Sequence, residues 1–308
     1  MQRRVVIVGA GLAGLTCAQE LAALGHVPLV LDKGRRPGGR SCSRKDEDGR
    51  TFDHGAQFFT ARDPWTATRV AEWHEAGVVA PWQPRGAHAD HPEWWVGTPC
   101  MGALAEHLAR ELDVRCSTHV TAVTKNEAGW HVETRDSSFE ADTLVMAIPA
   151  PQAAALLGEL APTGDTDACW AAMVRLSEGG AVDVLERKEG PFSWAAREAS
   201  KPGRSTRPGE DLWTVHASAE WSQAHLEQPA ERVAHELSAA LADALSQSVL
   251  GAQAHRWRYA KPRVDTPVGC HVDVGAKLIV CGDWMQSPRI EGALTSGRAA
   301  AQRWAELR

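Results

Sequence analysis

The residues best suited to chemistry form a glycine turn and an acid close to the start of the chain. Gly9, Gly11 and Gly14 follow a short β-branched run, and Asp32 comes 18 residues after the third glycine. Such glycines permit a tight turn beside a pyrophosphate and close packing of helix on strand, while the acid accepts hydrogen bonds from an adenosine ribose. The pattern predicts dinucleotide binding. The expected contacts are Gly9, Gly11, Leu12, Ala13, Gly14, Asp32 and Lys33.

Three further polar or glycine-rich segments extend this site. Gly39 and Arg40 follow the second expected strand, where backbone and a guanidinium can reach the same pyrophosphate. Asp283, after Gly282 and a buried strand, lies at the carboxyl end of a strand, where open α/β sheets bind their ligands. The segment 291–293 then starts a helix whose N-terminus would stabilise negative charge on a bound ligand.

Two narrower motifs are shared with a known family. They are Asp-His-Gly-Ala-Gln-Phe-Phe at 53–59 and Ser-Lys-Pro-Gly-Arg at 200–204. With the Gly-Gly-Arg and Gly-Asp elements, the sequence resembles the flavin-containing amine oxidase superfamily and, within it, the bacterial renalase group. The resemblance covers essentially the whole chain. It implies non-covalent FAD, whose further contacts would be Gly39, Arg40, Gly55, Ala56, Gln57, Val120, Gly282, Asp283, Glu291, Gly292 and Ala293.

The same resemblance implies a reaction. The substrates would be the 2-dihydro isomers of NAD(P)H, with the 6-dihydro isomers as a second candidate, and the products NAD(P)+ and, with O2, H2O2. A dihydropyridine that loses a hydride becomes an aromatic pyridinium, so no proton has to leave and no catalytic base is required. We therefore expect flavin N5 to accept the hydride and no side chain to act as acid, base or nucleophile.

Catalysis of this kind depends on holding a flat ring against the flavin. The chain has 13 Trp and one Tyr, and indoles are rigid, apolar walls for such a ring. Strand alternation places Arg256 and Arg258 on one face, and the loop 197–207 adds Lys201 and Arg204; these cations are candidates for the substrate's phosphates. The expected substrate-binding residues are Gln57, Phe59, Trp194, Trp257, Trp284, Arg204, Arg256 and Arg258.

Other interpretations remain open. The first is a flavin-dependent oxidase of amines or other small molecules, although Tyr259 is the only tyrosine available for an aromatic cage. The second is a flavin-binding protein without turnover. An NAD-dependent dehydrogenase is disfavoured by the Gly-Gly-Arg and Gly-Asp elements. His88, Asp90 and His91 resemble metal ligands but are expected in a solvated loop, and His54 is expected to hold a turn, so no metal site is predicted.

The elements that must position these residues alternate between strand and helix. Strands are predicted over 5–8, 27–31, 114–123, 130–134, 144–148 and 277–281, and helical stripes over 101–112 and from about 229 to 245. The fold class is α/β: a Rossmann-type FAD-binding domain interleaved with a smaller α+β substrate domain of sheet plus helix. We expect the FAD-binding domain at 1–75, 98–150 and 263–308, and the substrate domain at 76–97 and 151–262.

Composition narrows the partners. The chain has 308 residues and a formal net charge of −6, which disfavours nucleic acid, and no apolar run approaches membrane-spanning length. The seven cysteines are scattered without a Cys-x-x-Cys pair, which favours a reducing compartment. We therefore expect a cytoplasmic enzyme whose partners are a small dinucleotide and O2.

Overall fold

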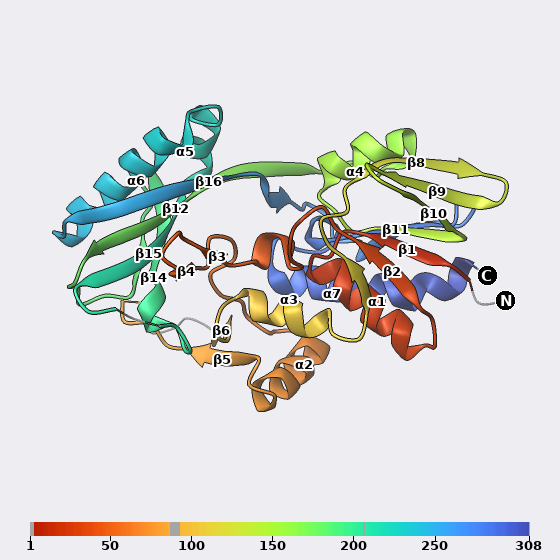
Figure 1. Cartoon of the computed structure of the whole chain (residues 1–308). Coiled ribbons are helices and arrows are strands. Elements are labelled where there is room, and N and C mark those ends of the chain that lie inside the picture. Colours follow the sequence, from red (N-terminus) through yellow and green to blue (C-terminus); the bar gives the residue numbers. More distant parts are fainter. Residues whose placement is uncertain (1–2, 87–92, 206, 308) are drawn as a thin grey trace.

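The two halves of the protein are built on two large sheets of different construction (Figure 1). The computed structural model describes residues 3–86, 93–205 and 207–307. A six-stranded, mostly parallel sheet occupies one half, and a five-stranded antiparallel sheet occupies the other. The long strands β12 (Asp165–Ser177) and β16 (Val249–Arg263) run between the two halves.

The six-stranded sheet has the order β17-β18-β11-β1-β2-β7. Strand β1 lies at its centre and pairs in parallel with β2 and β11, and only β17 runs antiparallel to its neighbour. The strands are β1 (Val5–Val8), β2 (Pro28–Leu31), β7 (Asp113–Arg115), β11 (Thr143–Met146), β17 (Cys270–Asp273) and β18 (Leu278–Cys281).

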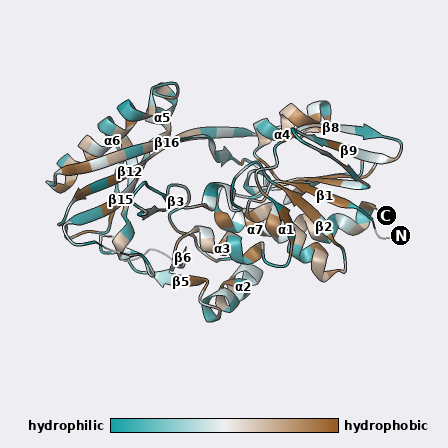
Figure 2. Cartoon of the chain, viewed as in Figure 1, coloured by the Kyte–Doolittle hydropathy of each residue, from teal (hydrophilic) through white to brown (hydrophobic). Residues whose placement is uncertain are grey.

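Both faces of this sheet are covered, which explains its continuous apolar strands. Val5 and Ile7 pack against one layer of helices, whereas Val6 and Val8 pack against a second core on the opposite face. The strands are accordingly among the most hydrophobic parts of the ribbon (Figure 2). The first layer contains α1 (Leu12–Ala23), α3 (Gly102–Leu108) and α7 (Ile290–Gln302). The second contains α4 (Ala150–Leu157) and the strands β8 (Val120–Asn126), β9 (Gly129–Thr134) and β10 (Ser138–Ala141).

The five-stranded sheet has the order β13-β14-β15-β12-β16. Helix α6 covers one of its faces with the buried stripe Val233, Leu237 and Leu241, as the sequence predicts. The other face is turned towards the short β3 and β4 strands (Figure 1). The remaining elements of this half are β13 (Val184–Glu186), β14 (Phe192–Arg197), β15 (Glu210–Ala217), α5 (Ala219–Ala224) and α6 (Ala230–Leu245).

The prediction of one strand over 114–123 is wrong. The chain forms β7, leaves the six-stranded sheet at residues 116–119, and begins β8 in another sheet. Ser117 has a φ of 54°, and its N–H donates to the carbonyl of Gly34 at 2.7 Å. The turn therefore follows the end of β2, a tertiary contact that strand alternation cannot reveal.

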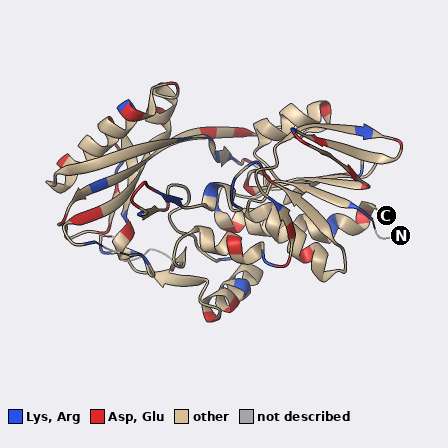
Figure 3. Ribbon diagram, viewed as in Figure 1, with Lys and Arg blue, Asp and Glu red and all other residues tan. Residues whose placement is uncertain are grey.

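Smaller elements connect the two halves. They are β3 (Arg44–Lys45), β4 (Thr51–Phe52), α2 (Pro64–Glu75), β5 (Val79–Trp82), β6 (Trp94–Gly97) and the 3-10 turns Gly39–Ser41, Gly158–Leu160, Glu198–Ser200, Asp283–Met285 and Arg303–Leu307. Charged residues are spread over both halves rather than gathered on one element (Figure 3).

The predicted fold class is confirmed: a Rossmann-type α/β sheet is combined with a second sheet-plus-helix unit. The proposed domain boundaries stay a prediction. None of the helices in the described ranges is both long enough and apolar enough to cross a membrane.

Candidate active site

One large cavity lies between the two sheets. Its volume is about 1840 Å³, and its lining comes from the ends of β1, β2, β11 and β18 on one side and from β14, β15, β12 and β16 on the other. The carboxyl ends of parallel strands are where open α/β sheets bind ligands. Most of the predicted site residues line it: Gly9, Gly11, Leu12, Ala13, Asp32, Lys33, Gly39, Arg40, Gly55, Ala56, Val120, Gly282, Asp283 and Ala293, with Trp194, Trp257, Trp284, Arg256 and Arg258.

The glycine turn is built as the spacing predicts. A Cβ on Gly9 would lie 2.5 Å from the carbonyl oxygen of Ala147, and a Cβ on Gly14 would lie 2.0 Å from that of Gly9. These two positions therefore exclude any side chain, because strand and helix pack against them. A Cβ on Gly11 would meet nothing within 4 Å. Gly11 instead leaves its backbone bare to the cavity, at the N-terminus of α1, where an anionic ligand is favoured.

Asp32 follows β2 at the rim of this turn. Its carboxylate accepts hydrogen bonds from the N–H groups of Ala10 and Gly34, both at 2.6 Å. The two bonds fix the carboxylate against the glycine turn while the residue still lines the cavity. This is the position expected for contact with an adenosine ribose.

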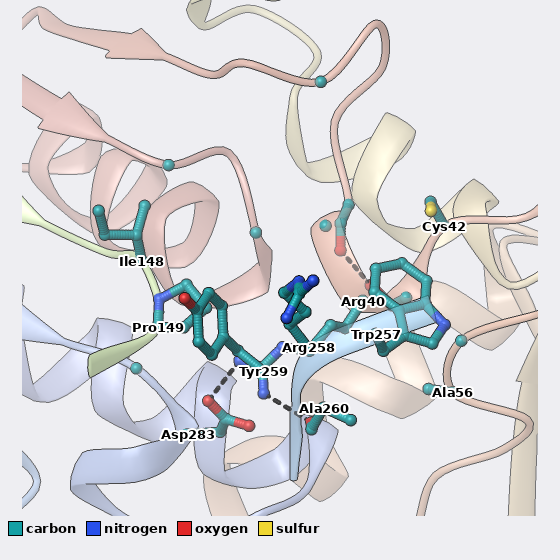
Figure 4. A pocket seen from close by; sticks show the side chains of 18 of the residues that line it. Arg40, Cys42, Ala56, Ile148, Pro149, Trp257, Arg258, Tyr259, Ala260 and Asp283 are labelled. Atoms are coloured by element: carbon teal, nitrogen blue, oxygen red, sulfur yellow. Dashed lines mark hydrogen bonds and ion pairs between the residues drawn. The ribbon is translucent and has the colours of Figure 1, made fainter. Parts of the chain in front are cut away.

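Arg40 and Asp283 meet across the opposite part of the cavity (Figure 4). The guanidinium donates to the Asp283 carboxylate at 2.6 Å and to the carbonyl of Ala260 at 2.9 Å. Arg40 thereby links the segment after β2, the end of β18 and strand β16. Two residues singled out separately in the sequence thus form one ion pair at the ligand site.

The predicted start of the last helix is confirmed, but its three residues have different surroundings. Ala293 lines the cavity, while Gly292 packs so closely that a Cβ would lie 2.1 Å from the carbonyl oxygen of Ser287. The Glu291 carboxylate accepts hydrogen bonds from the N–H groups of Arg62 and Asp63. Glu291 therefore anchors a neighbouring loop and does not line the cavity.

Indoles line the cavity on both of its sides, Trp194 and Trp257 from the antiparallel sheet and Trp284 from the six-stranded one. Trp257 donates from its ring nitrogen to the carbonyl of His54 at 2.9 Å, so its plane is fixed. Trp284 is held in the same way by the carbonyl of Ile148 at 3.1 Å. Trp194 also lines the cavity and packs against Phe58 with ring centroids 5.4 Å apart.

Two histidines lie against Trp257 and a third, His216, also lines the cavity, in a part of the wall that the sequence did not single out as a cluster. The rings of His54 and His255 lie 5.0 and 4.4 Å from the Trp257 ring. Burial lowers the pKa of His54 to about 3 and that of His216 to about 4, and it also lowers the pKa of His255. All three imidazoles are therefore neutral near pH 7. His54 is not only a turn residue, because it also lines the cavity.

Gln57 and Phe59 are placed differently from the prediction, since neither lines the cavity. Phe59 is 3% exposed and bonds to the Trp95 backbone. The Gln57 amide accepts from Lys201 at 2.8 Å and lies 3.4 Å from the ring of His216. Gln57 therefore supports the wall from behind.

The interpretation of Lys201 and Arg204 as phosphate contacts is wrong. Their side chains are 0% and 2% exposed and lie in a buried ion cluster with Asp53 and Glu198. Lys201 contacts Glu198 at 2.9 Å and Asp53 at 3.2 Å, and Arg204 pairs with Asp53. The glycine and proline of this loop suggested a solvated connection, but its charges are compensated by Glu198, three residues before Lys201, and by Asp53, which lies more than a hundred residues away in the chain.

Arg256 and Arg258 share one face of β16, as alternation predicts, and both line the cavity rim. Each donates to the carboxylate of Glu227. Among the described residues no three His, Cys, Asp or Glu side chains form a metal-binding group, and the segment containing His88, Asp90 and His91 lies outside those residues.

Comparison with known proteins identifies the family to which the chain belongs. A model of the NAD(P)-binding Rossmann-like domain matches residues 7–73, and one of the flavin containing amine oxidoreductases matches residues 82–304. The chain belongs to the flavin-containing amine oxidoreductase family. Its cofactor is FAD.

Individual relatives share either a short segment or only the fold. The 15-cis-phytoene desaturases of Synechococcus elongatus and Arabidopsis thaliana are each 46% identical over 61 residues, which is 20% of this chain but only 13% and 11% of those enzymes. A structure from Exiguobacterium sp. 255-15, whose description assigns it to the protoporphyrinogen oxidases, has a TM-score of 0.79 at 12% identity, covering 100% of this chain and 99% of the other. Cyclohexylamine oxidase from Brevibacterium oxydans IH-35A gives 0.74 at 13% identity, covering 99% of both chains.

The cavity fits this cofactor. The bare backbone at Gly11 offers a cradle for the pyrophosphate, and Asp32 lies where the adenosine ribose would be held. Arg40 and Asp283 would hold the central part of the cofactor, and the N-terminus of α7 would face its flavin.

Proposed function

We propose that the protein is a renalase-like, FAD-dependent oxidase of dihydronicotinamide isomers. Its substrates would be 2-dihydro isomers of NAD(P)H, with 6-dihydro isomers as the second candidate, and its product NAD(P)+. Bound FAD would supply the two-electron acceptor for the hydride, and O2 would reoxidise the reduced cofactor with release of H2O2.

The observation that carries this proposal is the neutral, aromatic wall around Trp257. An alkyl amine is protonated at pH 7 and must lose a proton before it can be oxidised, so an amine oxidase benefits from a competent proton acceptor. The buried histidines of the cavity wall are poor ones, since the pKa of His54 is about 3 and that of His216 about 4. A dihydropyridine has no such requirement, and this wall suits it.

The acidic groups of the cavity do not supply a base either. Asp283 is paired with Arg40, Asp167 is paired with Arg263, and Asp32 is held by backbone N–H groups at the adenosine end. Each of these carboxylates is thus already occupied by a guanidinium or by backbone N–H groups. Within the described part of the chain, the lining offers no other carboxylate.

The size and charge of the cavity support a dinucleotide substrate. Pockets for small ligands typically measure about 300–1,000 Å³, whereas this one measures about 1840 Å³. Space therefore remains beside the cofactor for a second large molecule. Arg256 and Arg258 at the rim provide cations for its phosphates.

Anaerobic mixing tests the proposal. The FAD-loaded protein should be bleached quickly by 2-dihydroNAD(P), slowly by ordinary 4-dihydroNAD(P)H, and almost not at all by cyclohexylamine or benzylamine. Equal bleaching by an amine would establish the amine-oxidase alternative. Failure of every reductant would indicate a flavin-binding protein without turnover.

We also propose a cytoplasmic setting in which the dinucleotide and O2 are the only partners. All seven cysteines carry free thiols, which suits a reducing compartment. The net charge of −6, with acidic and basic residues spread along the ribbon (Figure 3), disfavours a nucleic-acid partner.

A further inference from the structure

One exposed carboxylate bridges the two arginines at the cavity rim. Glu227 lies in the loop between α5 and α6, and its side chain is 68% exposed. One carboxylate oxygen accepts from Arg258 at 2.7 Å. The other accepts from Arg258 and from Arg256, both at 2.8 Å.

The two arginines are held to different degrees. Arg256 also donates to the carbonyl of Leu226 at 2.6 Å and lies over the ring of Trp170, 5.6 Å from its centroid. Among the described residues, Glu227 is the only hydrogen-bond partner of the Arg258 guanidinium. Arg256 is therefore anchored, while Arg258 depends on a single exposed contact.

The Glu227 carboxylate occupies the hydrogen-bond donors of Arg258 that a phosphate would use. Both terminal nitrogens of the guanidinium donate to the carboxylate, which is the paired geometry that arginine also offers to phosphate oxygens. The two anions cannot hold the same donors at once. Because exposed ion pairs are weak, a phosphate can replace the carboxylate at this position.

We propose that Glu227 is a charge filter acting on the cavity-lining Arg258, an internal competitor that a ligand must displace from this guanidinium with a phosphate. This inference rests on the proposed function, since it concerns the phosphates of a dinucleotide substrate. A ligand with a pyrophosphate regains the contacts that Glu227 gives up. A phosphate-free ligand regains none, so the filter favours dinucleotides over simple pyridines and amines.

Calorimetric titration of the FAD-loaded protein tests this with Glu227→Gln, which removes the charge and keeps the shape. The dissociation constant of NAD+, the expected product, should fall about fivefold at low salt, since the lost competitor is an exposed ion pair. The effect should shrink as salt screens the pair. Binding of 1-methylnicotinamide, which has no phosphate, should not change.

Two controls make the result specific. Glu220→Gln removes an equal charge from the neighbouring helix α5 and should leave the NAD+ dissociation constant unchanged. In an Arg258→Ala background, Glu227→Gln should have no further effect. The inference is overturned if Glu227→Gln matches Glu220→Gln, if it weakens NAD+ binding, if its effect persists without Arg258, or if NAD+ binds to none of the proteins.

The inference and the proposed function can fail separately. Wild-type protein that 2-dihydroNAD does not bleach, combined with tighter NAD+ binding by Glu227→Gln, would reject the oxidase reaction and keep the filter. Normal bleaching of the wild-type protein, combined with an unchanged NAD+ dissociation constant in Glu227→Gln, would keep the oxidase reaction and reject the filter.

Discussion

The buried histidines of the cavity wall, His54 and His216, connect the chemistry of the cavity with the stability of the protein. Burial lowers the pKa of His54 to about 3 and that of His216 to about 4, while an unfolded histidine titrates near 6.5. Between these values the unfolded chain binds more protons than the native one. Stability is therefore intact above about pH 6.5 and falls as the pH is lowered through that window.

Urea unfolding at several pH values measures this effect. Each buried histidine should contribute about 1.4 kcal/mol of lost stability per pH unit below its unfolded pKa. His216→Gln should make the dependence shallower by one such contribution, whereas His235→Gln, on the exposed side of α6, should not. An unchanged slope in His216→Gln would show that His216 titrates normally in the folded protein.

Single residues also show where sequence reasoning succeeds and where it stops. Asp32 and Asp283 could be placed in the site because each follows a strand end, and strand ends are visible as apolar runs. Lys201 and Arg204 could not, because their shared partner Asp53 is brought to them only by the folded chain, where it joins the nearby Glu198 in one buried cluster. Charge and loop composition describe a segment alone, not the acids that will surround it.

At the scale of elements, the turn between β1 and α1 separates two roles that look alike in the sequence. Gly14→Ala would place a methyl group 2.0 Å from the Gly9 carbonyl oxygen, so it should lower the melting temperature even without cofactor. Gly11→Ala would point a methyl group into open space. This variant should fold normally but bind FAD more weakly, by about tenfold or more, because the methyl group occupies the pyrophosphate cradle.

Thermal unfolding of the FAD-free proteins, followed by FAD titration, distinguishes these outcomes. Wild-type FAD affinity in Gly11→Ala would place the pyrophosphate elsewhere in the cavity.

The positions of β1, α1 and α6 could be predicted because runs or periodic stripes of apolar residues mark them. The break between β7 and β8 could not, since a hydrogen bond to Gly34 in the preceding turn creates it.

At the scale of the whole molecule, the cavity lies between the two large sheets, so a bound cofactor would contact both of them. FAD would contact the glycine turn on one side and lie against β16 on the other, so binding should stabilise the folded state as a whole. At a free FAD concentration about 100 times the dissociation constant, the expected gain is about 2.7 kcal/mol. Melting temperatures measured against FAD concentration check this, and protein whose melting temperature ignores FAD would contradict a site between the sheets.

The strand order of the six-stranded sheet also decides when the cofactor can be captured during synthesis. Strand β1 is made first, yet its neighbour β11 and the next strand β18 are translated more than a hundred residues later. Helix α7 then packs so closely on α1 that a Cβ at Gly297 would lie 2.2 Å from the carbonyl oxygen of Ala13. The glycine turn and β2 are therefore made long before β11, β18 and α7 complete the site, and FAD capture becomes one of the last events of folding.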